Sequence, residues 1–238
     1  MKRESQLLSW TSAARTDIGL VRSRNEDACL ARPERGLWVV ADGMGGHAFG
    51  DVASRTIVEA MDRLDPPVNM DQFIADARAM VHQINQDLRA DAQARHVPVM
   101  GSTIVVLLAH GAQAACLWAG DSRIYLFRKG RLHQLTQDHS QPDSNMITRA
   151  VGAAETVELD LGTLAARDGD MYLLCSDGLS NPVPDEEIAG ALACGDPGQA
   201  ADELITLARA NGGRDNITAV VVRADDSGDD KTMLNPAL

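Results

Sequence analysis

Aspartate residues at the ends of short apolar runs give this sequence its strongest chemical signal. Residues 37–46 read Leu-Trp-Val-Val-Ala-Asp-Gly-Met-Gly-Gly, so an apolar run ends at Asp42 and three glycines follow within four residues. Such a run is typical of a buried strand, and the glycines let the backbone turn and let a ligand approach it. A carboxylate beside bare backbone carbonyls suits a hard cation such as Mg²⁺ or Mn²⁺. Because an Asp-Gly pair after a strand is also a common turn, this stretch alone leaves both interpretations open.

The same arrangement recurs at three further places along the chain. Asp177 follows an apolar run, Asp215 precedes one, and Asp121 lies in a turn between two of them. Grouped carboxylates repel one another unless cations lie between them. If the four aspartates face one edge of a sheet system, they predict a site that holds more than one metal ion through oxygen ligands.

The composition limits which classes of protein are plausible. The chain has 238 residues, enough for one good-sized core or two small domains, and its formal net charge is −12. This charge argues against a nucleic-acid partner, since such proteins usually carry a basic face. We find no internal repeat and no break in composition that would mark a second domain. We therefore expect one domain over residues 1–224 and an acidic, weakly apolar tail over 225–238 that does not pack.

The cysteines and the N-terminus indicate where the protein resides. The four cysteines are widely spaced and form no Cys-x-x-Cys pair, which favours small buried side chains in a reducing compartment. Residues 1–8 lack the apolar segment of a signal peptide, and no apolar run approaches the roughly 20 residues of a membrane span. We expect a cytoplasmic monomer with no membrane partner.

The periodicity of apolar residues predicts an α+β protein with strands in runs and helices in pairs. Helical spacing covers residues 50–64, a stretch from a capping Asp71 to about residue 94, and residues 185–193 and 197–210. The expected strands are residues 8–15, 28–32, 36–41, 103–109, 113–119, 124–128, 131–135, 156–161, 170–175 and 217–222.

Seven short motifs occur in an order that matches a known family. The chain resembles the bacterial form of the metal-dependent Ser/Thr protein phosphatases of the PP2C (PPM) type, over about residues 9–223. The matching motifs are Asp17-x-Gly19-x-x-Arg22-x-x-Asn25-Glu26-Asp27, Asp42-Gly43-Met44-Gly45-Gly46-His47, Gly101-Ser102-Thr103, Gly120-Asp121-Ser122-Arg123, Thr136-x-Asp138-His139-Ser140, Ser176-Asp177-Gly178 and Gly213-x-Asp215-Asn216.

The resemblance implies a four-layer α-β-β-α sandwich, in which helix pairs flank two antiparallel sheets. It also implies two Mn²⁺ or Mg²⁺ ions at one end of the sandwich. Asp42 would bridge them, the Gly43 carbonyl would bind one ion, and Asp177 and Asp215 would bind the other. Asp121, with Asp177, matches the place where bacterial members hold a third ion, although a Gly-Asp-Ser turn is satisfactory structure on its own.

The resemblance assigns further residues around the metals. Arg22 would clamp the substrate phosphate, although it could instead be a surface cation. Glu26 and Asp27 would lie around metal-bound waters, and Asn216 would fix the turn beside the metal ligand Asp215. Asp17, which could be only a turn former, and His47 and His139 are interpreted as structural.

Two departures from the family pattern bear on mechanism. Animal members carry a histidine directly after the Asp-Gly pair, a candidate general acid, whereas this chain has Met44, as bacterial members do. The group that protonates the leaving alkoxide therefore stays open between water and another residue. Only eight residues separate Ser140 from Arg149, so the flap of bacterial members would be short and the site open.

The resemblance implies a phosphatase that hydrolyses phosphothreonine and phosphoserine through a metal-activated water and opposes a bacterial Ser/Thr kinase. The short flap resembles phosphatases that accompany type VI secretion, whose partners would be a cognate kinase and a forkhead-associated-domain protein. One alternative is a non-catalytic pseudophosphatase that binds phosphoproteins, but such proteins usually lose metal ligands. Another is a partner-switching phosphatase of the stress response, but no sensor domain is visible in this sequence.

Overall fold

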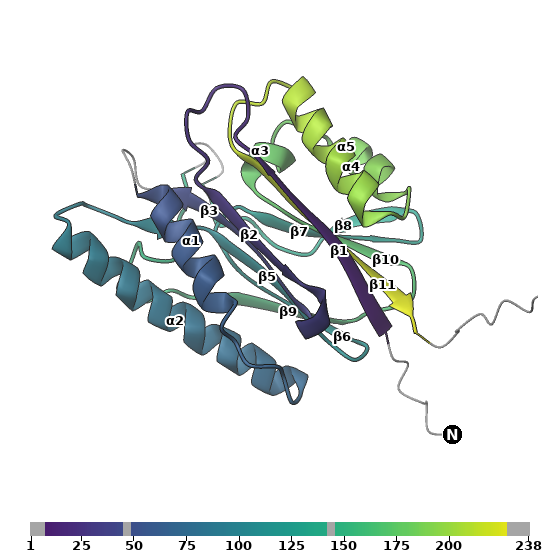
Figure 1. Cartoon of the computed structure of the whole chain (residues 1–238), viewed down its shortest axis with the longest axis horizontal. Helices are drawn as coiled ribbons and strands as arrows, with labels where there is room; N and C mark the ends of the chain where they lie inside the picture. Colours follow the sequence, from purple (N-terminus) through teal and green to yellow (C-terminus); the bar gives the residue numbers. More distant parts are fainter. Residues whose placement is uncertain (1–7, 45–48, 142–145, 228–238) are drawn as a thin grey trace, which may run out of the picture.

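Two antiparallel sheets form the centre of the molecule (Figure 1). The computed structural model describes residues 8–44, 49–141 and 146–227. One sheet has the strand order β1-β11-β10-β7-β8, formed by Leu8–Asp17, Ile217–Asp226, Asp170–Cys175, Arg123–Arg128 and Arg131–Gln134. The other has the order β2-β3-β5-β6-β9, formed by Asp27–Arg32, Leu37–Met44, Ile104–His110, Gln113–Ala119 and Asp160–Ala165. The two-residue strand β4 (Gly101–Ser102) pairs with β3.

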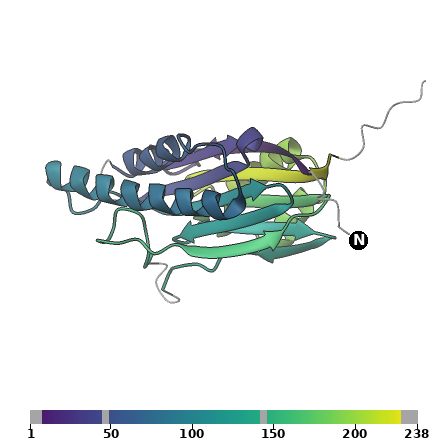
Figure 2. The same ribbon diagram turned by 90° about the horizontal axis from the view of Figure 1, so that it is seen from below.

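Helices cover the outer face of each sheet. α1 (Gly50–Met61) and α2 (Met70–Ala94) lie on the six-stranded sheet, as Figure 1 and its turned view, Figure 2, show. α4 (Asp185–Leu192) and α5 (Pro197–Ala210) cover the five-stranded sheet. The short helix α3 (Asp177–Ser180) and the 3-10 turn η1 (Pro33–Arg35) complete the set. This arrangement confirms the predicted four-layer α-β-β-α sandwich.

Alternation along the strands explains why the layers form. In β3, Val39 and Ala41 pack against α1 and α2, whereas Trp38 and Val40 pack into the core between the sheets. Successive side chains of a strand point to opposite faces, so an uninterrupted apolar run predicts a strand that is buried on both sides. The apolar residues before Asp42 therefore lie inside the sandwich, and Asp42 lies where this buried part of β3 ends.

Several predicted boundaries were wrong in detail. The side chain of Asn69, rather than that of Asp71, caps α2 by accepting a hydrogen bond from the Gln72 N–H (2.8 Å). α1 ends at Met61, before residue 64.

The predicted strand 156–161 also shifts along the chain, because Val157 and Leu159 pack into the core on the α2 side as a loop. Pairing with β6 begins only at Asp160, and β9 then runs to Ala165. α3 was not predicted.

β11 is longer than predicted and continues to Asp226, which pairs with Leu8 of β1. The strand thus runs two residues into the stretch assigned to the tail, and residues 228–238 of that tail lie outside the described residues. No described helix is long and apolar enough to cross a membrane.

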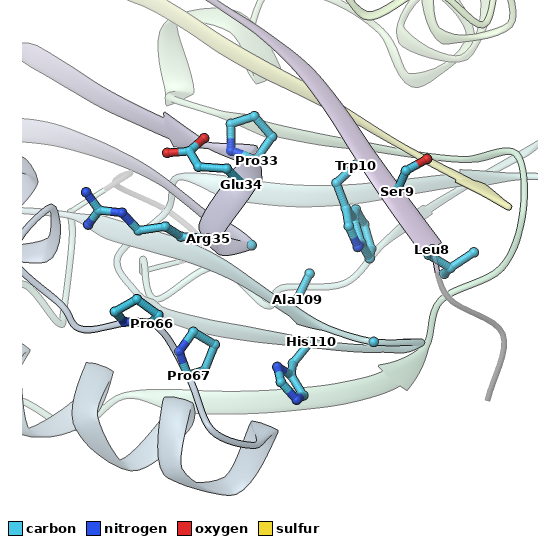
Figure 3. A pocket seen from close by; sticks show the side chains of 12 residues that line it. Leu8, Ser9, Trp10, Pro33, Glu34, Arg35, Pro66, Pro67, Ala109 and His110 are labelled. Carbon is cyan, nitrogen blue, oxygen red and sulfur yellow. The ribbon is translucent and has the colours of Figure 1, made fainter. Parts of the chain in front are cut away.

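An open groove of about 600 Å³ lies where β1 and β3 begin (Figure 3). Its walls include Trp10, Arg35, Pro67 and His110. Trp10 also packs on Trp38, with ring centroids 5.6 Å apart. The aspartates of the motifs lie where the same two strands end, so the groove is separate from the predicted site.

Candidate metal centre and active site

The predicted aspartates converge at one end of the sandwich, because the strands that carry them begin or end there. Asp27 begins β2 and pairs with Asp42, near the end of the antiparallel β3. Asp177 comes just after β10, and Asp215 comes just before β11, the antiparallel neighbour of β10. Asp121 lies in the turn between β6 and β7. All four of the other carboxylates raise the pKa of Asp42 through their charge, so the five groups share one electrostatic neighbourhood.

Asp27 joins the two sheets at this end. Its Oδ2 accepts hydrogen bonds from Ser176 Oγ (2.8 Å), which follows β10, and from Thr218 Oγ1 (2.7 Å), in β11. Its Oδ1 is buried and has no hydrogen-bond partner among the described residues. Burial raises the pKa of Asp27, these two hydrogen bonds oppose that rise, and the charges of Asp177 and Asp215 add to it. A buried carboxylate oxygen without a partner is costly, and a nearby cation or water would relieve it.

Backbone hydrogen bonds hold Asp42 in place. The Asp42 N–H donates to Thr103 Oγ1 (3.1 Å), and its carbonyl accepts from Thr103 N (2.9 Å) and Ser102 Oγ (2.9 Å). The carboxyl group lies deep among protein atoms, and this desolvation raises its pKa well above the ordinary value. The charge of Asp27 is the next largest cause. The ionised carboxylate therefore needs positive charge close by.

The pKa values of Asp177 and Asp121 are raised by the same two causes, burial and neighbouring negative charge. Burial raises the pKa of Asp177, the charge of Asp215 raises it further, and a hydrogen bond with Asp42 opposes the rise. Burial, followed by the charge of Asp177, raises the pKa of Asp121 to about 6. Asp121 Oδ1 is buried without a hydrogen-bond partner in the described part of the chain. The ionised carboxylates of the cluster therefore repel one another, and bound cations would reduce this repulsion.

The glycines of the Asp-Gly pairs serve close backbone packing. A Cβ on Gly43 would lie 2.1 Å from the Gly50 carbonyl oxygen, and one on Gly178 would lie 1.9 Å from the Asn216 carbonyl oxygen. Real Cβ atoms never approach so closely, so only glycine fits at either position. The Gly43 N–H also donates to the Glu26 carbonyl (3.1 Å), which fixes the turn after Asp42.

Arg22 reaches the site from the loop between β1 and β2. Its guanidinium donates to Asp215 Oδ2 (2.6 Å), and its side chain is 53% exposed. An exposed guanidinium at the rim can meet an incoming anion, so this position agrees with a phosphate contact. The phosphate role of Arg22 stays a prediction.

Asn216 holds the loops around the site together. Its Oδ1 accepts from the Glu26 N–H (2.8 Å), and its Nδ2 donates to the Ile18 and Arg24 carbonyls (3.0 Å each). The Asn216 N–H donates to Asp215 Oδ1 (2.8 Å). This geometry agrees with the predicted structural role beside Asp215.

Asp17, Glu26 and His139 lie on strand ends and loops around the carboxylate cluster. Asp17 accepts from Gly19 N (2.8 Å) and pairs with Arg209 (2.7 Å), so it stabilises a turn. His139 is buried and accepts from the Gly120 N–H through Nδ1 (3.3 Å), as expected for a loop residue. The Glu26 carboxylate lies against Gly50, at the start of α1. His47 and the middle of the short flap (residues 142–145) lie outside the described residues.

Four hydroxyl side chains lie behind the aspartates, and the sequence alone assigned no role to them. Ser176 and Thr218 hold Asp27, while Thr103 Oγ1 and Ser122 Oγ form a hydrogen bond of 2.7 Å behind Asp42. All four side chains are buried. The available signal was a polar residue beside a strand-end aspartate or inside an apolar run, as Thr218 is within residues 217–222.

The residues present fit oxygen-liganded divalent cations. Their donors are carboxylates and backbone carbonyls, and one oxygen each of Asp27 and Asp121 is buried with no partner within the described ranges. In those same ranges, no three carboxylate, imidazole or thiol groups already surround one point at ligand distance. Contacts from Arg22 to Asp215 and from Asp42 to Asp177 occupy some of the oxygens instead. The individual ligand assignments therefore stay predictions.

The cysteines take no part in this cluster. All four are free thiols. Burial raises the pKa of Cys29 to about 11 and those of Cys116 and Cys175 to about 12. A thiol that stays protonated is a poor nucleophile, so the arrangement does not support covalent cysteine catalysis by these three.

The fold and the carboxylate cluster are those expected of a protein that binds divalent cations, and comparison with known proteins identifies its family. A family model described as protein phosphatase 2C matches residues 21–215, which is most of the chain. The chain belongs to the protein phosphatase 2C family.

Individual relatives agree with this assignment. Serine/threonine protein phosphatase PstP of Mycobacterium tuberculosis is 40% identical over 228 residues, which cover 88% of this chain and 44% of PstP. The chain thus spans less than half the length of this relative.

Two solved structures resemble the whole fold. PppA, described as a key regulatory component of T6SS in Pseudomonas aeruginosa, has a TM-score of 0.89 and 44% identity, covering 92% of this chain and 99% of that one. The catalytic domain of PstP in complex with two manganese ions has a TM-score of 0.85 and 39% identity, covering 92% and 100%.

Proposed function

We propose that this chain is a Mn²⁺- or Mg²⁺-dependent protein phosphatase that removes phosphate from phosphothreonine and phosphoserine in proteins. The observation that carries the proposal is the convergence of mutually repelling aspartates from both sheets at one end of the sandwich. The exposed guanidinium of Arg22 stands at the same place. Family membership and the names of the relatives support the same activity.

Asp42, the Gly43 carbonyl, Asp177 and Asp215 would hold two ions, and Asp121 would contribute to a third. Such ions, when bound, lower the pKa of a water molecule and stabilise the charge that develops on phosphoryl oxygens. Cation binding at these carboxylates would also relieve the repulsion that now raises the pKa of Asp42 and Asp177.

The remaining steps belong to the side chains around the ions. Arg22 would turn from Asp215 to the substrate and hold two phosphate oxygens with its planar guanidinium. Asp27, fixed by Ser176 and Thr218, would keep negative charge beside the site and orient water. Met44 has no proton to donate, so the leaving alkoxide is protonated by water or by another group.

The biological setting is inferred from the relatives. We propose a cytoplasmic, monomeric phosphatase that opposes a Ser/Thr kinase. The similarity to PppA favours a role beside type VI secretion, with a cognate kinase and a forkhead-associated-domain protein as partners. Co-purification of the tagged chain with a kinase and with such a phosphothreonine reader would support this setting. Association with stress-response or cell-wall regulators instead would contradict it.

Phosphate release from matched phosphothreonine, phosphoserine and phosphotyrosine peptides tests the activity. We expect release from the first two with Mn²⁺, and none after EDTA treatment until Mn²⁺ is restored. A folded, metal-loaded protein that binds the peptides without turnover would contradict the proposal and indicate a pseudophosphatase. Release that persists in EDTA would show that the chemistry needs no metal.

A further inference from the structure

A cleft of about 340 Å³ opens beside the carboxylate cluster, between the end of α3 and the turn that leads from α5 into β11. Asp177 and Asp215 form the wall that it shares with the proposed metal centre. Asn181, Pro182, Asn211 and Arg214 form the rest, together with the backbone of Gly178. A residue next to a phosphorylated one in a protein substrate would therefore lie over this cleft when the phosphate is at the metals.

The amide side chains of the cleft are already committed to the fold. Asn211 Nδ2 donates to the Pro182 carbonyl (3.0 Å), and Asn181 Nδ2 donates to Asp177 Oδ2 (3.2 Å). These bonds hold the two walls in place. They leave the cleft with a fixed shape and make its one arginine the group most able to select a ligand.

Arg214 differs from the other arginines at this end of the molecule. Arg22 pairs with Asp215 (2.6 Å), Arg24 lies 3.8 Å from Asp51, and Arg209 pairs with Asp17 (2.7 Å). The Arg214 side chain is exposed, and none of the hydrogen bonds or ion pairs in the described part of the chain involves it. Its charge is therefore free to meet a ligand, although the molecule as a whole is strongly acidic.

The neighbouring loop places apolar surface next to this arginine. Leu20 N–H donates to the Gly213 carbonyl (2.6 Å), so the loop after β1 lies against the residue that precedes Arg214. Leu20 and Val21 are 58% and 69% exposed. Large apolar side chains that remain exposed beside a site are typical of surfaces that contact a macromolecule. A peptide substrate fits this surface better than a small phosphate ester does.

We infer that this cleft binds the residue beside the phosphorylated residue of a protein substrate, and that Arg214 selects an acidic or phosphorylated side chain there. This inference rests on the proposed phosphatase function. Cations at Asp177 and Asp215 would neutralise the two carboxylates of the cleft and leave Arg214 as its uncompensated charge. An anionic side chain is the complement of that charge, and a guanidinium can bind a carboxylate or a phosphate with two parallel hydrogen bonds.

The test compares hydrolysis of phosphothreonine peptides that differ at one flanking position. The series carries Gln, Glu, phosphoserine or Lys at each position near the phosphothreonine, with p-nitrophenyl phosphate as a substrate that has no flanking residue. For the wild type we expect kcat/KM to be roughly fivefold higher with Glu than with Gln at one position, the scale of an exposed ion pair. A second phosphate carries more charge and should exceed Glu if the natural ligand is a doubly phosphorylated segment.

Arg214→Gln should remove this preference and leave the Gln peptide and p-nitrophenyl phosphate unchanged. Arg214→Glu should reverse the preference toward the Lys peptide. Arg63→Gln is the matched control, because Arg63 is also exposed and lies just beyond the far end of α1. It changes the net charge equally and should keep the preference.

The outcomes separate this inference from the proposed function. A wild type that hydrolyses every peptide equally would overturn the inference and leave the phosphatase proposal intact. An Arg214→Gln variant that loses activity on all substrates, p-nitrophenyl phosphate included, would show that Arg214 supports Asp215 and would also overturn the inference. A wild type that hydrolyses no substrate would overturn both proposals.

Discussion

The two ends of the sandwich differ in how their charged side chains are paired. At the groove end, Arg32 donates to both oxygens of Asp62 (2.8 and 2.7 Å), and Arg35 donates to the Asp62 carbonyl (2.7 Å). At the other end, carboxylates from both sheets face one another and their pKa values rise. The groove end has a hollow of about 600 Å³ and paired charges, whereas the unrelieved charge lies at the aspartate end. Unsatisfied charge is therefore the better guide to where chemistry takes place.

Asp42→Asn should have the largest effect on function. The amide keeps the shape of the side chain but removes the charge that would hold the proposed ions, so we expect phosphate release to fall about a hundredfold or more. The metal-free variant should unfold at a higher temperature than the metal-free wild type, because one of the repelling charges is gone. Steady-state kinetics with Mn²⁺ and calorimetric unfolding in EDTA measure the two effects. Wild-type activity in the variant would show that Asp42 is not a ligand.

Gly178→Ala should have the largest effect on stability. The new Cβ would lie 1.9 Å from the Asn216 carbonyl oxygen, so the turn must shift, at a cost of about 3 kcal/mol in the free energy of unfolding. Gly190→Ala is the matched control, since a Cβ there meets nothing within 4 Å and α4 should gain about 0.5–1 kcal/mol. Urea denaturation of both variants measures the difference. Equal stabilities would contradict the close packing at Gly178.

Ser176→Ala should have an intermediate effect. Its hydroxyl donates to Asp27 Oδ2 (2.8 Å) and accepts from the Thr218 N–H (3.0 Å), so its loss leaves two buried polar groups short of a partner. We expect a loss of about 1–3 kcal/mol in the free energy of unfolding. Ser9→Ala removes only an exposed hydrogen bond to Asp225 (3.3 Å) and should change stability by less than about 0.5 kcal/mol. A Ser176→Ala variant as stable as Ser9→Ala would contradict the role of this hydroxyl.

Arg32→Gln, at the groove end, should have the smallest effect. The pair that Arg32 forms with Asp62 is about one-third exposed on each side, so its removal should cost at most about 1 kcal/mol. Phosphate release should not change, because the pair lies at the opposite end of the strands from the aspartates. A marked loss of activity in this variant would show that the two ends are coupled and would contradict this difference between them.

The positions of the strand-end aspartates could be predicted from the sequence more closely than the ends of several helices and strands. Asp42 and Asp177 could be located because each ends an apolar run, and the end of a strand is set by the same alternation that builds the core. Asn69 could not be preferred over Asp71 as a cap, because both residue types cap helices well and only the backbone geometry decides between them. The partners of Asp27 lie about 150 and 190 residues away along the chain, so only the pairing of the strands could reveal them.

Titration of the metal-free protein with Mn²⁺ by calorimetry, in the wild type and in Asp177→Asn, tests the central claim most directly. The claim is that the strand-end aspartates form the metal centre at which phosphate is released. It predicts at least two ions for the wild type, as in the solved PstP catalytic domain. It also predicts that Asp177→Asn loses at least one ion, with phosphate release falling in parallel. If Asp177→Asn binds Mn²⁺ with unchanged stoichiometry and affinity, the metal centre lies elsewhere and the claim is wrong.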